Sequence, residues 1–209
     1  MYKSFTILEL IITILILSII ISLAIPKQKT AKLGLAKEQL ILHLKYTRYI
    51  AMLDNKYKHK NIDETKPWHK ARWTLKFYNC NSNVGGLYYI IFSDKDGSGT
   101  KPKKIETLKD PLTNKYIYAT GACSKDNIID KLEQVKVTQY FGVSKIEMSC
   151  NDTSSIGQLS FSSDGNVYTK FETYNKDAYK LEEQCNIKLY DKNNKHKTIY
   201  IEPKTGYIH

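Results

Sequence analysis

The chain has 209 residues, of which 42% are hydrophobic and 25% are charged, enough for one packed domain plus an appendage and too apolar for a wholly disordered chain. Its formal net charge is +11, and because Lys3 and Glu9 cancel within residues 1–26, the whole excess belongs to residues 27–209. Such a charge attracts nucleic acid, anionic lipid or an acidic partner. The lysines are scattered among Asp and Glu, however, so we interpret most of them as a solvated surface.

Apolar side chains are concentrated at the N-terminal end of the chain. The run from Phe5 to Ile25 has 21 residues and contains one charged side chain, Glu9. A helix of this length spans about 30 Å, the thickness of a bilayer core. Three interpretations compete: a secretory signal cleaved after Ala24, an ordinary membrane anchor, and the leader of a prepilin.

Glu9 distinguishes these interpretations, because a carboxylate in an apolar run costs about 2.5 kcal/mol or more near the bilayer centre. Neither a signal sequence nor an ordinary anchor gains from it. Residues 4–10, which read SFTILEL, resemble the type III signal of type IV pilins and pseudopilins. The resemblance implies that prepilin peptidase cuts between Ser4 and Phe5 and then methylates the Phe5 amine. Ser4 stands where this family usually has glycine.

The same resemblance implies roles in assembly for Phe5 and Glu9. The Phe5 amine of one subunit would pair with Glu9 of another, because two buried charges that are costly alone become tolerable together. Pro26 follows Phe5 by 21 residues, as a proline commonly does in this family. Proline lacks an N–H and clashes with the preceding turn, so we expect a helix kink at Pro26.

Residues 27–58 predict a continuation of the helix with an amphipathic pattern. Apolar side chains recur at intervals near three and four, a spacing that places them on one face for packing against a sheet. They are Leu33, Ala36 or Lys37, Leu40, Leu44 and Ala51, with Ile41 and Tyr46 widening the stripe.

From Ala71 onward the pattern changes to the alternation of β-strands. Glycine and asparagine turns separate the β-rich runs, which cover residues 73–78, 87–92, 135–141, 157–161, 167–171, 187–190 and 198–201. We therefore expect an α+β, pilin-like fold in which a long N-terminal helix packs on a C-terminal antiparallel β domain. Its parts are a leader (1–4), a transmembrane half-helix (5–26), an amphipathic half-helix (27–58) and a β-rich periplasmic domain (59–209).

Scattered residues also resemble one branch of the family, the GspH/FimT-like minor pseudopilins. The matching positions are Arg48, Ala51 and Asn55 in the helix, Trp73, Phe92-Ser93-Asp94 before Asp96-Gly97, Leu159-Ser160-Phe161 with Gly165, and Ile199-Tyr200-Ile201 with Thr205-Gly206. The resemblance implies a minor rather than a major subunit.

Four cysteines, Cys80, Cys123, Cys150 and Cys185, follow the apolar segment. An even number of widely spaced cysteines fits disulfides in an oxidising compartment. Of the three possible pairings we favour the sequence-local one, Cys80–Cys123 with Cys150–Cys185, and four buried thiols are the alternative. A zinc site is disfavoured, because structural zinc sites usually take two ligands from one short loop.

No motif in the chain predicts catalysis. The five histidines (His43, His59, His69, His196 and His209) lack metal-ligand spacing, and there is no P-loop, G-x-S-x-G or H-E-x-x-H. We expect no enzymatic activity, no cofactor and no metal.

The C-terminal stretch combines basic and aromatic side chains, which together can hold a nucleic-acid backbone and stack on bases. The candidate DNA-binding residues are Lys192, Lys195, Lys197 and Lys204, with His196, Tyr200 and Tyr207 among them. Some relatives in the branch bind DNA through a basic tail, but residues 207–209 here contain no Lys or Arg. A solvated strand edge is the alternative interpretation.

Together these patterns predict a minor pilin or pseudopilin, a structural subunit of a type IV pilus or of a type II secretion-like pseudopilus. It would be a single-pass protein of the bacterial inner membrane with its C-terminal domain in the periplasm. Its expected partners are prepilin peptidase, other major and minor pilins or pseudopilins, and the membrane itself. The alternatives are a DNA-binding minor pseudopilin of a competence (DNA uptake) system and a secreted soluble β protein.

Overall fold

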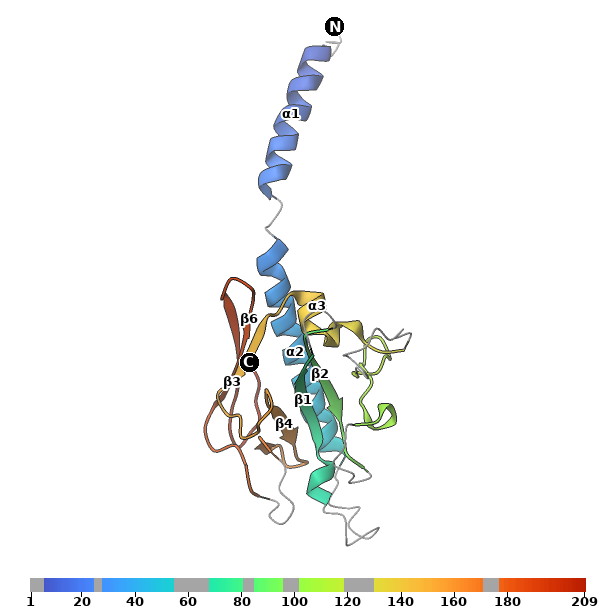
Figure 1. Cartoon of the computed structure of the whole chain (residues 1–209). Coiled ribbons are helices and arrows are strands. Elements are labelled where there is room, and N and C mark those ends of the chain that lie inside the picture. Colours follow the sequence, from blue (N-terminus) through green and yellow to red (C-terminus); the bar gives the residue numbers. More distant parts are fainter. Residues whose placement is uncertain are drawn as a thin grey trace. The chain divides into compact units, whose positions relative to one another are not determined.

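The computed structural model describes residues 6–24, 28–54, 68–80, 85–95, 102–118, 130–170 and 177–209. The fold is α+β, with N-terminal helices followed by two antiparallel sheets (Figure 1). The chain divides into two compact units, Met1–Lys32 and Leu33–His209, which are described separately below.

Helix α1 of the first unit spans Ile7–Ala24. Isoleucine and leucine dominate it, with no polar face. Among the described residues, no helix combines the length and the apolarity required of a membrane span. Ser4, Phe5 and Pro26 lie outside the described residues, so the cleavage site and the helix kink stay predictions.

Helix α2 spans Gln28–Leu53, and the stripe predicted on it is confirmed. Its members are at most 2% exposed and belong to the hydrophobic core: Leu33, Ala36, Leu40, Leu44 and Ala51. Ala36 rather than Lys37 occupies the second position. The helix ends at Leu53, before the predicted residue 58, and Asp54 follows it as a bend. The Asp54 carboxylate accepts a hydrogen bond of 2.9 Å from Trp73 Nε1. Residues 55–58 lie outside the described part.

The first sheet has the strand order β2-β1-β4-β5, and each neighbouring pair is antiparallel. Its strands are β1 (Trp73–Asn79), β2 (Leu87–Phe92), β4 (Gln158–Phe161) and β5 (Val167–Tyr168). Strands β2, β4 and β5 lie within predicted β-rich runs, and β1 extends one residue beyond the predicted run 73–78. Leu75 and Phe77, which alternate along β1, are fully buried and face the same side as Tyr89 of β2.

The second sheet has the order β3-β6-β7 and is also antiparallel. Its strands are β3 (Lys145–Met148), β6 (Cys185–Tyr190) and β7 (His196–Ile201). Buried and half-buried side chains alternate along β6, so one face of the sheet joins the core and the other, called here the outer face, meets solvent. A bridge between Ile201 and Ile208 adds the last residues to the edge of β7.

One predicted strand, 135–141, is wrong. The structure has a 3₁₀ turn, η4 (Glu133–Val135), and a short helix, α3 (Val137–Phe141), in its place. Gly142 takes a left-handed conformation (φ 75°), and its N–H donates to the carbonyl of Thr138, so it caps the helix as glycine commonly does. The remaining 3₁₀ turns are η2 (Trp68–Ala71) and η3 (Lys104–Glu106). Strand β3 was not predicted.

Helix α2 is also tied to the C-terminal segment of the chain. The Arg48 Nε donates to the Thr205 carbonyl oxygen at 2.9 Å. Gly206 (φ 61°) packs so closely that a Cβ there would lie 2.8 Å from the carbonyl oxygen of Gly165 and 3.3 Å from Arg48 Nε. These residues, which the sequence analysis grouped by resemblance to one branch of pseudopilins, therefore lie together in the fold.

This close approach predicts opposite effects of alanine at two glycines. Gly206→Ala should lower the free energy of unfolding by about 1–3 kcal/mol, because it adds a Cβ at positive φ and against backbone. Gly34→Ala should raise it by about 0.5–1 kcal/mol, because Gly34 lies inside α2 with no heavy atom within 4 Å of a new Cβ. Urea unfolding of the full chain in mild detergent measures both. Equal effects would contradict the packing described at Gly206.

Candidate functional site

The N-terminus of α1 carries a capping box formed by Thr6 and Glu9. The Thr6 N–H donates to Glu9 Oε2 at 3.0 Å, and the Thr6 hydroxyl donates to the same oxygen at 3.1 Å. In return, the Glu9 N–H donates to Thr6 Oγ1 at 3.3 Å. The acidic group also lies at the positive end of the helix dipole. Glu9 therefore stabilises the start of its own helix, a local role that the sequence analysis did not identify.

Around α1, large apolar side chains are exposed on every side. Their exposed fractions run from 47% at Ile12 to 80% at Ile7. The set comprises Ile7, Leu8, Leu10, Ile11, Ile12, Ile14, Leu15, Ile16, Leu17, Ile19, Ile20 and Ile21. A helix that is apolar all round is normally surrounded by other protein or by lipid.

Helix α2 also carries apolar side chains on the side opposite its buried stripe. Leu35, Leu42 and Tyr49 repeat every seven residues and are 59%, 43% and 57% exposed. Met52 and Leu53 extend this group to the end of the helix, at 45% and 64%. These five residues are called the outer stripe of α2. A spacing of seven is that of a seam between two helices.

A buried polar cluster links α2 to β2 and to the following loop. His43 Nδ1 lies 2.6 Å from Tyr89 Oη, and His43 Nε2 lies 3.3 Å from Asp110 Oδ1. Gln39 donates to Tyr89 Oη at 3.2 Å, and Thr113 donates to Asp110. Because His43, Tyr89 and Asp110 are 1%, 1% and 4% exposed, they present no surface to a substrate, and we assign the cluster to the fold.

Burial controls ionisation within this cluster. Desolvation lowers the pKa of His43, although the hydrogen bond and charge of Asp110 oppose it. Burial opposes ionisation of Asp110 as well, but hydrogen bonds from Thr113 and His43 outweigh it and lower the pKa of the carboxyl. A neutral imidazole next to a carboxylate fits the observed distances, with Tyr89 donating to Nδ1 and Nε2–H donating to Asp110.

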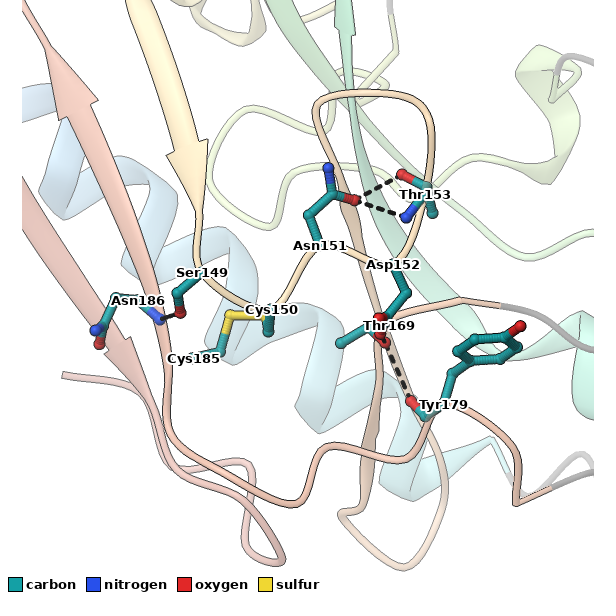
Figure 2. Close-up of a disulfide and its surroundings, with 9 residues drawn as sticks. All are labelled: Ser149, Cys150, Asn151, Asp152, Thr153, Thr169, Tyr179, Cys185 and Asn186. Atoms are coloured by element: carbon teal, nitrogen blue, oxygen red, sulfur yellow. Dashed lines mark hydrogen bonds between the residues drawn. A yellow bond between two sulfur atoms is a disulfide. The ribbon is translucent and has the colours of Figure 1, made fainter.

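The predicted Cys150–Cys185 disulfide is confirmed (Figure 2). It joins the turn after β3 to the first residue of β6, directly beyond a pair of hydrogen bonds between Ser149 and Asn186. The Cα atoms of the two cysteines are 5.3 Å apart. Cys80 is also disulfide-bonded, but Cys123 lies outside the described residues, so the Cys80–Cys123 pairing stays a prediction.

The structure does not gather the four candidate DNA-binding lysines into one patch. Lys192 and Lys195 lie in the turn between β6 and β7, and Lys197 lies near the start of β7. Lys204 lies in the turn beyond the opposite end of that strand. All four are exposed. Sequence reasoning named His196, Tyr200 and Tyr207 beside these lysines, but it did not include Tyr190, which the strand register places opposite His196.

The described residues offer no evident site for a metal ion, since their His, Cys, Asp and Glu side chains form no group of three. Comparison of the chain with protein-family models, with curated proteins and with solved structures gives no match. The resemblance to type IV pilins therefore rests on the residues quoted from the sequence.

The His43 cluster predicts that stability falls in mild acid. The unfolded chain binds a proton at His43 near pH 6.5, whereas the folded chain resists it until lower pH. The free energy of unfolding should therefore be highest above pH 6.5. Below pH 6.5 it should decline, with His43 contributing at most about 1.4 kcal/mol per pH unit. Urea unfolding between pH 5 and 8 measures the decline, and His43→Gln should make it shallower. An unchanged slope in that variant would contradict the assignment to His43.

The disulfide predicts a loss of stability when it is removed. The bond spans 35 residues, and closing such a loop restricts the unfolded chain enough to stabilise the fold by roughly 2–4 kcal/mol. Cys150→Ser/Cys185→Ser should lower the free energy of unfolding by that amount relative to the oxidised wild type, and the difference should disappear when the wild-type bond is reduced. Cys150→Ser alone serves as the control, since it should cost about as much as the double change. A double variant as stable as the wild type would rule out this contribution.

Proposed function

We propose that the chain is a minor pilin or pseudopilin, a structural subunit of a type IV pilus or of a type II secretion-like pseudopilus. The observation that carries the proposal is the exposed apolar surface around α1, and the outer stripe of α2 is a second exposed apolar surface. Exposed apolar surface of this extent indicates contact with lipid or with other protein. A filament subunit uses both environments, first the membrane and then a bundle of neighbouring helices.

In this proposal residues 5–26 insert into the bacterial inner membrane, and residues 27–209 lie in the periplasm. The proposed span is longer than α1, and it matches the roughly 20 residues that a bilayer core requires. The Cys150–Cys185 disulfide supports an oxidising location for the β domain, because disulfides are rare in the reducing cytoplasm.

Maturation would follow the resemblance of residues 4–10 to the type III signal. Prepilin peptidase would cut between Ser4 and Phe5 and methylate the new amine, which stays cationic. Glu9 of a neighbouring subunit would then pair with this amine inside the apolar core, which sets the axial register of the incoming subunit. A carboxylate has about four acceptor sites, so the capping box at Oε2 leaves Glu9 able to accept a further donor.

The outer stripe of α2 would extend the same contact beyond the bilayer. Leu35, Leu42 and Tyr49 have the spacing needed to pack along another helix. The described part of the β domain covers the opposite side of α2, where Leu40 and Leu44 are buried. The helix is thus available to bind its own domain and a neighbour at the same time.

Two substitutions separate the capping role of Glu9 from the proposed pairing role. Glu9→Gln keeps a capping side chain but removes the charge, so the protein should be processed yet fail to enter the filament. Thr6→Ala removes the capping hydroxyl but keeps the carboxylate, so recruitment should persist. Recovery of the subunit in sheared filaments of the producing cell, with antibody detection, measures both. Normal recruitment of Glu9→Gln would contradict the register role.

Mass spectrometry of the N-terminal peptide from the same membranes provides the control for processing. An N-methylated Phe5 terminus is expected for the wild type and for both variants. A terminus at Met1 or Ile25 would instead indicate a plain anchor or a secreted protein, and the proposal would fail.

A further inference from the structure

The loop between β3 and β4 contains Asn151-Asp152-Thr153, an Asn-x-Ser/Thr triplet. Asn151 is the only asparagine of the sequence with Ser or Thr two positions later, and the residue between them is not proline. Such a triplet is the acceptor for glycans that are attached to asparagine in secreted domains. Because the motif is short and also occurs by chance, its place in the structure decides its meaning.

The triplet lies at the surface in a loop that is fixed at both ends. Its three residues are exposed or half-buried. Directly before it, Cys150 is bonded to Cys185 of β6 (Figure 2). After it, the Gly157 carbonyl oxygen accepts a hydrogen bond of 3.1 Å from the Phe77 N–H of β1. The loop therefore presents the triplet to solvent in a defined position.

Within the loop, the side chains of Asn151 and Thr153 face each other (Figure 2). The Thr153 N–H donates to Asn151 Oδ1 at 2.9 Å, and the Thr153 hydroxyl donates to the same oxygen at 2.7 Å. Asn151 Nδ2 donates to the Ser155 carbonyl oxygen at 2.7 Å. The Asp152 carboxylate accepts from the Thr169 hydroxyl, which holds the middle residue in place.

These hydrogen bonds bear on the reactivity of the Asn151 amide. An amide nitrogen is a weak nucleophile, because its lone pair is delocalised into the carbonyl group. When the nitrogen gives up a proton, negative charge develops on Oδ1. Two donors that already point at Oδ1 stabilise this charge, as donors aimed at a developing oxyanion do. The loop thus favours the form of Asn151 whose nitrogen can attack an electrophile.

We propose that Asn151 is an N-glycosylation site, modified by a transferase that uses a saccharide carried on a lipid pyrophosphate. Asn151 Nδ2 attacks the anomeric carbon of the saccharide, and a C–N bond forms as the C–O bond to the pyrophosphate breaks. The lipid pyrophosphate leaves with the bonding electron pair, and one Nδ2 proton passes to a base of the transferase. The step needs no oxidant or reductant.

The folded loop is compatible with the modified side chain. Asn151 Nδ2 has two N–H groups, and the bond to Ser155 uses one of them. Glycosylation consumes the other, so the bond to Ser155 can persist in the product, and Oδ1 keeps both of its donors. Since Asn151 is exposed, an attached glycan extends into solvent without displacing the core.

The disulfide and the triplet indicate the same compartment. Disulfides such as that of Cys150 are rare in the reducing cytoplasm, and N-linked acceptors belong to the surface loops of exported domains. This modification goes beyond the filament role proposed above. It shares with that proposal only the location of the β domain outside the cytoplasm.

The test is glycopeptide mass spectrometry of the full chain purified from membranes of the producing cell, with fragmentation that keeps sugars attached. The peptide that contains Asn151 should carry a saccharide mass, and the fragment ions should place it on Asn151. Asn151→Gln and Thr153→Ala should each abolish the modification. Thr153→Ser should retain it, because serine supplies a hydroxyl at the same position.

Asn193→Gln is the matched control, since Asn193 is exposed in the turn between β6 and β7 but is followed two positions later by Lys195. This variant should carry the glycan like the wild type. Urea unfolding of each variant shows whether it is folded, so that misfolding is not mistaken for loss of the acceptor. An unmodified Asn151 in the wild type would overturn the proposal, and so would a saccharide on Ser154 or Ser155 instead.

The same spectra separate this proposal from the filament role. A methylated Phe5 terminus on a chain without a glycan would overturn the glycosylation site and leave the pilin pathway standing. A glycan on Asn151 of a chain that begins at Met1 or Ile25 would support the site and contradict the pilin pathway.

Discussion

Helix α2 is apolar on two sides, and the described part of its own domain covers one of them. The buried side, from Leu33 to Ala51, supplies one wall of the core, and the β domain is organised against it. Burying such side chains contributes about 1.5–3 kcal/mol for each of the large ones. On the opposite side Leu42 and Tyr49 are exposed to water. This exposure gives a monomeric protein no stabilisation. The exposed second side is the physical argument behind the proposal of a multi-subunit assembly.

The polar contacts of α2 fix how the covered side sits on the domain. Hydrophobic burial is not directional, so it cannot by itself choose the rotation of a helix about its axis. His43 and Gln39 reach Tyr89, while Arg48 reaches the Thr205 carbonyl. A rotation that removed these contacts would leave the buried His43 and Tyr89 without partners, which costs about 1–3 kcal/mol for each group. The outer stripe is therefore presented at a defined angle.

Much of the fold was predictable because its patterns are local. Spacings of three and four residues identified the buried stripe of α2, and alternation identified the strands around Leu75 and Ile187. The short strand β3 was not predicted, because Ile146 is its only buried side chain and one buried residue makes no alternating pattern. The run 135–141 was misjudged because valines two residues apart suit a strand, while the helix there depends on the cap at Gly142.

The functional surfaces were less predictable, since they depend on which strands lie side by side. The N-terminal motif is contiguous, so it could be recognised in the sequence. The hydrogen bonds between Glu9 and Thr6 became evident only from the structure. Tyr190 lies opposite His196, and Tyr200 lies opposite His209, because the strand register brings them together; their spacing in the sequence does not show this. The same register separates Lys204 from Lys192, which sequence proximity had grouped.

The Cys150–Cys185 bond has a mechanical consequence for a chain that is pulled. Strands β4 and β5 both lie within the segment that the bond closes, so tension applied at the two ends passes through the sulfur atoms and bypasses them. The 35 residues between the cysteines would otherwise add roughly 120 Å to the extended length of the chain. With the bond intact, a stretching force cannot draw β4 and β5 out as an extended thread, although it can still separate the segments on either side of the bond.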